Sequence, residues 1–144
     1  MAIWYKNYRI EELNRISQGS MVGHLGIEFT EIGEDYLKAR MPVDHRTTQP
    51  LGLLHGGASV TLAESLGSTG AFLCVNPEEK IVVGLEINAN HIRGKRGGQV
   101  EGIARPVHIG NSTQVWEVRI VDEAGDLICI SRLTLAILDR NRSP

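Results

Sequence analysis

The first part of the chain contains two different hydrophobic periods. Arg9–Ser17 repeats an apolar side chain every three positions, which places Ile10, Leu13 and Ile16 on one face of a helix. Gly26–Val43 instead alternates apolar and polar side chains on both sides of a Gly-Glu-Asp turn. These patterns predict a short amphipathic helix followed by a β-hairpin.

A polar, proline-containing loop, Asp44–Gly52, leads into a long helix predicted from about Gly57 to Cys74. Its main stripe is apolar except for one threonine: Ala58, Leu62, Leu66, Thr69 and Leu73. A neighbouring stripe holds small residues: Ala63, Gly67, Gly70 and Cys74. Glycine inside a helix costs roughly 1 kcal/mol relative to alanine, so we expect another backbone to approach the helix closely on this side. The helix is predicted to be buried over most of its circumference.

Beyond Asn76-Pro77 the period changes to that of strands. Four long runs are predicted as strands: Lys80–His91, Gln99–Ile109, Thr113–Asp122 and Asp126–Leu138. A glycine-containing turn precedes each of the second, third and fourth runs. The last run is apolar on both faces, so we expect it inside the sheet rather than at its edge. The order predicts an α+β fold, an antiparallel sheet wrapped around or packed on one helix.

Length and composition indicate one domain, residues 1–144, with an N-terminal helical segment over 1–20 and a frayed tail over 139–144. The net charge of -2 gives no reason to expect nucleic acid as a partner. No apolar run is long enough to span a bilayer, and the N-terminus lacks the apolar region of a secretory signal. Cys74 and Cys129 are expected to be free thiols, which suits the cytoplasm.

One acidic residue, Glu64, interrupts the small and apolar residues of the long helix. A carboxylate in such surroundings is usually paired or used. Ser68 follows one turn later on the same face, so the two side chains can share a ligand. The helix start near Gly56 offers unpaired N–H groups, which suit a developing oxyanion in acyl transfer. Together these residues suggest hydrolysis of an ester or thioester, with Glu64 as nucleophile or general base.

The spacing of these groups has a consequence for assembly. Glu64 lies eight residues beyond Gly56, roughly 12 Å along a helix. One carbonyl group cannot accept from the Gly56 N–H while the same chain's Glu64 attacks its carbon. Two antiparallel copies of the helix, related by a two-fold axis, would bring Glu64 of one subunit beside Gly56 of the other. Catalysis by these residues therefore predicts a dimer.

Each feature also has a simpler structural interpretation. Glu64 can be a solvated helix residue, Ser68 a backbone-bonding hydroxyl, and His55-Gly56-Gly57 a tight turn entering a helix. Gln49, which precedes a proline, can cap its loop. Other catalytic motifs do not fit, because the chain has no G-x-S-x-G, no phosphate-binding glycine loop, and no histidine spacing typical of a metal site.

Three segments together resemble the hotdog-fold acyl-CoA thioesterases: "MPVDHRTTQPLGLLHGGASVTLAESLGS", "VVGLEINANHIR" and "ISRLTLAIL". The resemblance covers nearly the whole chain and is nearest to the phenylacetate-pathway-like group, in the branch with menaquinone and siderophore members. It implies a long central helix wrapped by an antiparallel sheet, which pairs with a second copy into a continuous sheet. It also implies a homodimer with a shared active site, and commonly a homotetramer.

The resemblance also implies roles for individual residues. Glu64 matches the catalytic carboxylate, and the Gly56 N–H with the Gln49 side chain matches the groups that polarise the thioester carbonyl. His55 matches a histidine that positions substrate, and Ser68 a hydroxyl near the carboxylate or the attacking water.

Three further residues are assigned to substrate binding: His91, Arg93 and Gly57. The chain departs from the family at two places. It has Ile92 and Gly94 around Arg93 where close relatives tend to read His-His-Arg-Pro, and Asn111 where they often carry an arginine. The second change removes an expected contact to the phosphate of CoA. The remaining candidates for that contact are Arg93, Lys95, Arg96 and Arg105, unless this basic loop is simply solvated.

The sequence therefore predicts a thioesterase that needs no cofactor or metal and acts on acyl-CoA or an acyl carrier protein. The resemblance favours an aromatic or medium-sized acyl group. Two alternatives on the same fold stay open: an acyl-CoA-binding protein without catalysis, and a hydratase or dehydratase.

Overall fold

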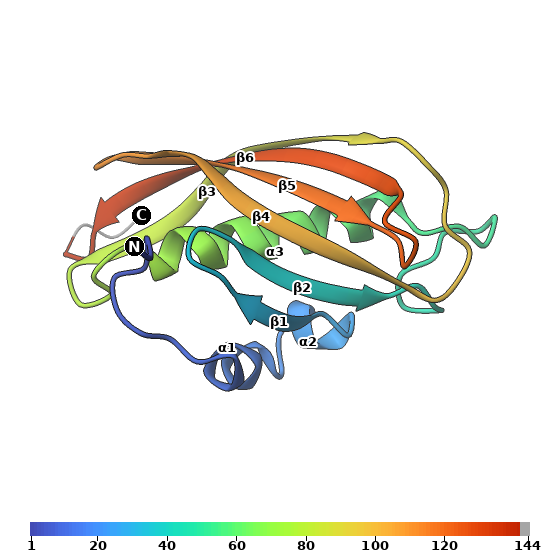
Figure 1. The fold of residues 1–144 in the computed structure, drawn as a ribbon, viewed down its shortest axis with the longest axis horizontal. Coiled ribbons are helices and arrows are strands. Elements are labelled where there is room, and N and C mark those ends of the chain that lie inside the picture. The colour runs from blue at the N-terminus through green and yellow to red at the C-terminus, as the bar shows by residue number, and fades with distance from the viewer. Residues whose placement is uncertain (142–144) are drawn as a thin grey trace.

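A six-stranded antiparallel sheet curves around one long helix in the computed structural model, which describes residues 1–141 (Figure 1). The elements are α1 (Ile10–Ser17), α2 (Met21–His24), β1 (Glu28–Ile32), β2 (Leu37–Pro42), α3 (Gly56–Leu73), β3 (Lys80–His91), β4 (Gln99–Ile109), β5 (Thr113–Val121) and β6 (Leu127–Asp139). The strand order is β1-β2-β4-β5-β6-β3, and each neighbouring pair is antiparallel. This confirms the predicted α+β hotdog architecture.

Alternation along the strands divides the sheet into a face toward α3 and a face toward solvent. In β5, Trp116, Val118 and Ile120 are fully buried, while Glu117 and Arg119 between them point outward. β6 pairs with β5 on one side and with β3 on the other, so the prediction of an internal position is confirmed. The alternating pattern thus determines which side chains pack on the helix.

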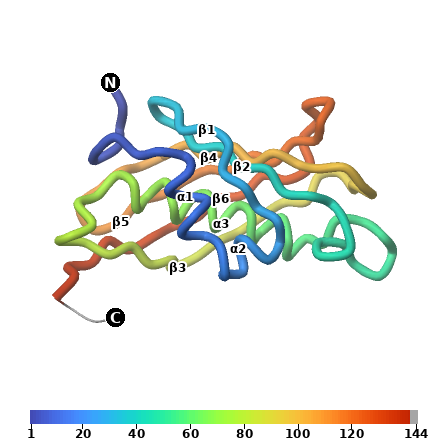
Figure 2. The backbone as a smooth tube through the Cα atoms, turned by 90° about the horizontal axis from the view of Figure 1, so that it is seen from below, coloured from blue at the N-terminus to red at the C-terminus, as the bar shows by residue number. Residues whose placement is uncertain are grey.

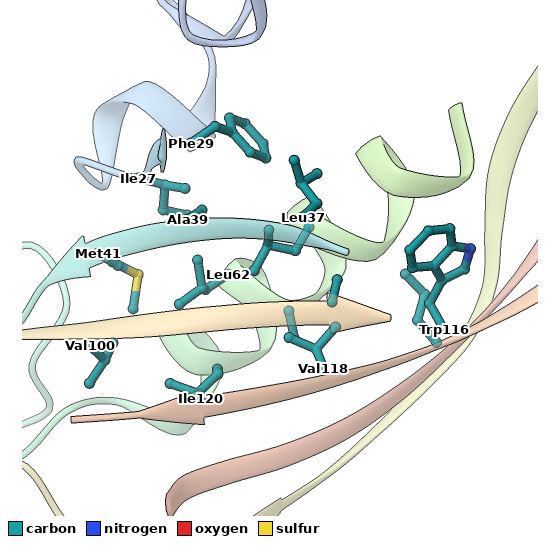
Figure 3. Packing of buried hydrophobic residues seen from close by; sticks show 14 of the residues in the cluster. Ile27, Phe29, Leu37, Ala39, Met41, Leu62, Val100, Trp116, Val118 and Ile120 are labelled. Carbon is teal, nitrogen blue, oxygen red and sulfur yellow. The ribbon is translucent and has the colours of Figure 1, made fainter. Parts of the chain in front are cut away.

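The core lies between α3 and the concave face of the sheet. Figure 3 shows Leu62 of α3 among apolar side chains from the strands, including Met41 and Val100. Leu62, Leu66 and Met41 are all fully buried. Full burial of such a side chain stabilises the fold by about 1.5–3 kcal/mol. This packing holds α3 at a fixed place against the sheet.

The small-residue side of α3 makes room for large side chains rather than for another backbone. A Cβ atom at Gly67 would lie 2.5 Å from Leu133 Cδ2, and one at Gly70 would lie 2.8 Å from the Trp116 ring. The expectation of a close backbone approach was therefore wrong. Glycine is needed here because β5 and β6 place their bulkiest inward side chains against the helix.

The N-terminal segment is only partly helical. Residues 1–9 are not helical and are held by backbone bonds such as Tyr5 N–H to Leu73 C=O at 2.8 Å. α1 forms as predicted, but Ile16 is 66% exposed. The side chain of Asn14 exchanges two hydrogen bonds, at 2.8 and 2.9 Å, with the backbone of Phe29, and this turns Ile16 to solvent. The one-turn helix α2 was not predicted.

The C-terminal strand begins and ends one residue later than predicted. β6 runs to Asp139, and Arg140 donates to the carbonyl oxygens of Glu79 and Pro77 at 2.8 and 2.9 Å. These two residues therefore belong to the folded domain. The last three positions of the predicted tail, 142–144, lie outside the described residues. None of the helices within residues 1–141 is long and apolar enough to cross a bilayer.

The tube in Figure 2 shows the loop between β2 and α3 at the end of the molecule opposite the two chain ends. The start of α3 and the end of β3 lie at this same end (Figure 1). Segments far apart in sequence therefore meet where the conspicuous His-Gly-Gly stretch begins the helix.

Candidate active site

A pocket of about 300 Å³ opens at the N-terminal end of α3. Four of the predicted site residues line it: Gln49, Gly56, His91 and Arg93. They come from the loop before α3, the first residue of α3, the end of β3 and the residues just beyond it. A larger depression of about 590 Å³ lies between the N-terminal segment and the β1–β2 turn, and no predicted site residue lines it. The predicted chemistry, rather than cavity size, identifies the candidate site.

The loop that carries Gln49 is held in place by several contacts. Asp44 and Arg46 form an ion pair, with 2.7 Å between Asp44 Oδ2 and Arg46 Nη2. The hydrogen bonds from Arg46 lower the pKa of Asp44 to about 2. The Thr47 hydroxyl donates to the Pro42 carbonyl at 2.7 Å. The His55 N–H donates in turn to the Thr47 carbonyl at 2.8 Å. The loop and the helix start therefore form one structural unit.

Two hydrogen-bond donors are available at the pocket. The Gln49 side-chain oxygen accepts from the Leu51 N–H, so the amide NH₂ group is left to donate. Within residues 1–141 the Gly56 N–H has no acceptor, as expected for the first turn of a helix. The capping role considered for Gln49 and its role toward a carbonyl are thus compatible, since each uses a different atom of the amide.

His55 caps α3. Its Nδ1 accepts from the Gly57 N–H at 2.8 Å, which leaves the proton of the neutral ring on Nε2. Of these two adjacent N–H groups, that of Gly57 is therefore already bonded to His55, and that of Gly56 is left to bind a ligand. His55 itself is exposed, so its Nε2–H points away from the cap.

The ring of His91 lies beside the start of the helix. A Cβ atom at Gly56 would come within 2.8 Å of His91 Nε2. Any larger residue at position 56 would displace either this ring or the helix start. His91 at the end of β3 and Gly56 at the start of α3 therefore lie side by side in the structure.

Arg93 lines the pocket but is already paired. Its guanidinium contacts Asp126 at 2.6 Å, with both side chains at least half exposed. The other basic candidates also have partners: Lys95 with Glu123 at 2.7 Å, Arg105 with Asp35 at 2.7 Å, and Arg96 with the Leu51 carbonyl at 3.1 Å. A phosphate group would have to compete with these partners, although exposed ion pairs are weak enough to exchange.

Glu64 and Ser68 lie in the middle of α3, away from this pocket. Both are partly buried, and neither side chain forms a hydrogen bond with any residue in the described range. The Glu64 carboxylate instead lies against β3, where a Cβ atom at Gly84 would be 2.8 Å from its Oε1. One chain therefore holds the candidate carbonyl-binding groups and the candidate carboxylate at two separate places.

Sequence reasoning missed Gly84 and the Asp44–Arg46 pair. A glycine inside a run of β-branched and apolar residues is a recognised sign of a bulge or a close approach. The run Ile81-Val82-Val83-Gly84-Leu85 carried that sign. The Asp44–Arg46 contact had no comparable signal. Within residues 1–141, no three His, Cys, Asp or Glu side chains gather as a metal site would require.

Residues 51–129 match the thioesterase superfamily. The chain is 57% identical over 136 residues to the 1,4-dihydroxy-2-naphthoyl-CoA hydrolase of Escherichia coli, covering 94% of this chain and 99% of that protein. It is 50% identical to the proofreading thioesterase EntH of Cronobacter turicensis, covering 94% and 98%. A thioesterase structure from Haemophilus influenzae superposes with a TM-score of 0.92 at 50% identity, covering 95% of each chain. A mutant thioesterase from Pseudomonas aeruginosa superposes with a TM-score of 0.95 at 47% identity, covering 96% and 99%.

Proposed function

The chain belongs to the thioesterase superfamily and is a thioester hydrolase, and we propose that it cleaves acyl-CoA or acyl-carrier-protein thioesters in a site shared by two subunits. The observation that carries this proposal is the pair of free donors at one pocket, the Gly56 N–H and the Gln49 amide. Because both groups line the same pocket, a thioester carbonyl bound there can accept a hydrogen bond from each of them in this proposal.

In the proposed reaction these donors bind the carbonyl oxygen as it becomes an oxyanion. One such donor lowers the barrier by roughly 3 kcal/mol. Glu64 then either attacks the carbonyl carbon or takes a proton from water that attacks it. Ser68, one helical turn from Glu64, orients that water. If water attacks, the C–S bond breaks, the proton that Glu64 took from the water goes to the leaving thiolate, and the acid remains. If Glu64 attacks, the C–S bond breaks to leave a mixed anhydride on Glu64 and a thiolate, and water then hydrolyses the anhydride to the acid, regenerates the carboxylate and supplies the proton for the thiol. Neither route uses a cofactor or a metal.

The remaining predicted residues have supporting roles in this scheme. His55 holds the helix start through its bond to Gly57, next to the Gly56 N–H that binds substrate in this scheme. His91 forms the pocket wall beside Gly56, and Arg93 exchanges Asp126 for a phosphate of CoA.

The open edge of the sheet supports a dimer. At one edge, Asn14 bonds both the N–H and the C=O of Phe29 and so closes part of β1. At the other edge, the twelve residues of β3 have β6 as their one neighbouring strand within residues 1–141. Leu85 on this strand is 61% exposed. A long, unprotected edge strand is a template for pairing with another chain.

Pairing of two β3 strands about a two-fold axis continues the sheet and sets the two α3 helices antiparallel. Because the Glu64 carboxylate already lies against β3, the axis brings it toward the partner's pocket. We therefore propose a homodimer as the smallest active unit. The homotetramer implied by the resemblance is a further prediction, and size-exclusion chromatography of the protein distinguishes it from the dimer.

For the substrate we propose an aromatic or medium-sized acyl group. The names of two similar proteins support this choice, since one acts on 1,4-dihydroxy-2-naphthoyl-CoA and another is a proofreading thioesterase. We propose the cytoplasm as the site of action. Cys74 and Cys129 are both free, and burial raises the pKa of the Cys74 thiol to about 12, which keeps it protonated and unreactive.

The test is thiol release from a panel of aryl- and alkyl-CoA and carrier-protein thioesters, with wild type beside Glu64→Gln. We expect the substitution to reduce kcat on the order of a hundredfold or more, because it removes the base or nucleophile. Glu12→Gln, at an exposed position of α1, is the matched control and should keep full activity.

Equal activity of Glu64→Gln and wild type would refute the role of Glu64. Tight acyl-CoA binding without turnover by wild type would support the binding-protein alternative. Addition of water to an enoyl-CoA would support the hydratase.

A further inference from the structure

The edge strand β3 contains an irregularity beside the candidate carboxylate. Its pairing with β6 shifts register between Gly84 and Glu86, so Leu85 is an extra residue at a β-bulge. Gly84 pairs with Leu135, which is fully buried, and therefore belongs to the face of the sheet that packs on α3. A side chain at position 84 would point toward the helix.

The space that such a side chain would fill is already taken by Glu64. A Cβ atom at Gly84 would lie 2.8 Å from Glu64 Oε1 and 3.9 Å from Glu64 Cδ. Apart from Gly84's own neighbours along the chain, no other heavy atom of residues 1–141 comes within 4 Å of that position. Among the described residues, position 84 thus faces a single side chain, that of Glu64, through its carboxylate.

The backbone gives no other reason for glycine at this position. Its φ lies outside the positive range, unlike that of Gly98, the residue just before β4. Alanine can adopt the conformation of Gly84 without strain, and inside a strand it normally improves stability. The requirement for glycine is therefore local and steric.

We propose that Gly84 is a positioning residue for the thioesterase reaction, because its missing side chain leaves the slot in which the Glu64 carboxylate is held against β3. The bulge at Leu85 shapes this slot by breaking the regular pleat next to it. This inference rests on the proposed catalytic role of Glu64. The carboxylate is the flexible end of its side chain, so a methyl group at position 84 displaces it without disturbing the core.

The size of the effect follows from the contact distance. Moving Oε1 from 2.8 Å to an ordinary contact of about 3.4 Å requires a shift of about 0.6 Å. Misplacement of a catalytic group by 1 Å can reduce the rate by about a hundredfold. We therefore expect Gly84→Ala to lower kcat by on the order of tenfold, with KM nearly unchanged, since the carbonyl-binding pocket at Gln49 and Gly56 is untouched.

The experiment compares Gly84→Ala with two control variants in the full-length protein. Gly97→Ala adds the same methyl group in open space and should leave kcat unchanged. Gly67→Ala forces a clash with Leu133 in the core, so it should lower the melting temperature with little change in kcat of the folded fraction. Gly84→Ala should show the reverse, with an unchanged or higher melting temperature and a lower kcat.

A double-substitution cycle isolates the contact itself. Glu64→Asp shortens the side chain by one methylene, so its carboxylate no longer reaches position 84. Gly84→Ala should then cause no further loss of kcat in the Glu64→Asp background. An equal tenfold loss in both backgrounds would overturn the inference, as would full activity of Gly84→Ala in the wild-type background.

The two levels of the proposal fail separately. If wild type does not turn over, or Glu64→Gln is fully active, the proposed function fails. If those two behave as expected and the glycine variant does not, only the positioning role fails. A crystal structure of Gly84→Ala gives a further test that does not depend on measuring activity. In that structure the Glu64 carboxylate should be displaced from β3.

Discussion

Mixed subunits provide the sharpest test of a site shared across a dimer. In one chain, the donors of Gln49 and Gly56 line the pocket at the start of α3, whereas the Glu64 carboxylate lies against Gly84 of β3. Eight residues of helix, roughly 12 Å, separate Gly56 from Glu64. A Gln49→Ala chain and a Glu64→Gln chain should each be nearly inactive alone. Removal of one oxyanion donor typically lowers kcat by about 10²–10³.

If the two variant chains assemble at random, the fraction of wild-type activity that the mixture recovers can be calculated. Mixed at 1:1, about half of the dimers contain one of each chain, and each mixed dimer has one site with both changes and one with neither. The mixture should therefore recover about a quarter of wild-type activity. The same fraction holds if dimers associate further into tetramers, because each site belongs to one dimer.

A second mixture serves as the control. Wild type mixed 1:1 with a chain that carries both substitutions should retain about a quarter of full activity if sites are shared, and about a half if each chain has its own site. Chains are co-refolded from denaturant, the dimer is isolated by size, and thiol release is measured at saturating substrate. No recovery in the first mixture, together with one half in the second, would refute the shared site.

Two further predictions concern stability. Asn14→Ala removes both hydrogen bonds to the Phe29 backbone and should reduce the free energy of unfolding by about 1–2 kcal/mol in urea titration, while the exposed control Arg15→Ala changes it by less than about 0.5 kcal/mol. An unchanged midpoint would mean that α1 does not protect this edge. Arg46 lowers the pKa of Asp44 from 3.8 to about 2, so this carboxylate contributes stability that is present above about pH 4 and lost as the pH falls through 2. The melting temperature of Asp44→Asn should therefore lie below that of wild type at pH 5 and converge with it near pH 2, and a constant difference across this range would contradict the assignment.

The sequence by itself determined the elements of the fold. β3 and β4 begin and end at the predicted residues, Lys80–His91 and Gln99–Ile109, and α3 starts one residue before its predicted start. These features follow from the local side-chain period, which differs between strand and helix and needs no knowledge of distant partners. The candidate site residues were also recognisable, because a lone carboxylate among small and apolar residues and a His-Gly-Gly stretch are visible in the sequence.

Only the tertiary structure decided what each of these residues faces. The sheet order places β3 at the edge beside β6, although β3 is followed by β4 in the chain. It therefore puts Gly84 against Glu64, and it puts Leu133 against Gly67 where a backbone was expected. Arg93 has Asp126, thirty-three residues away, as its partner. Periodicity encodes which face of an element is apolar, but contacts across the sheet depend on strand order and register, which arise when the whole chain packs.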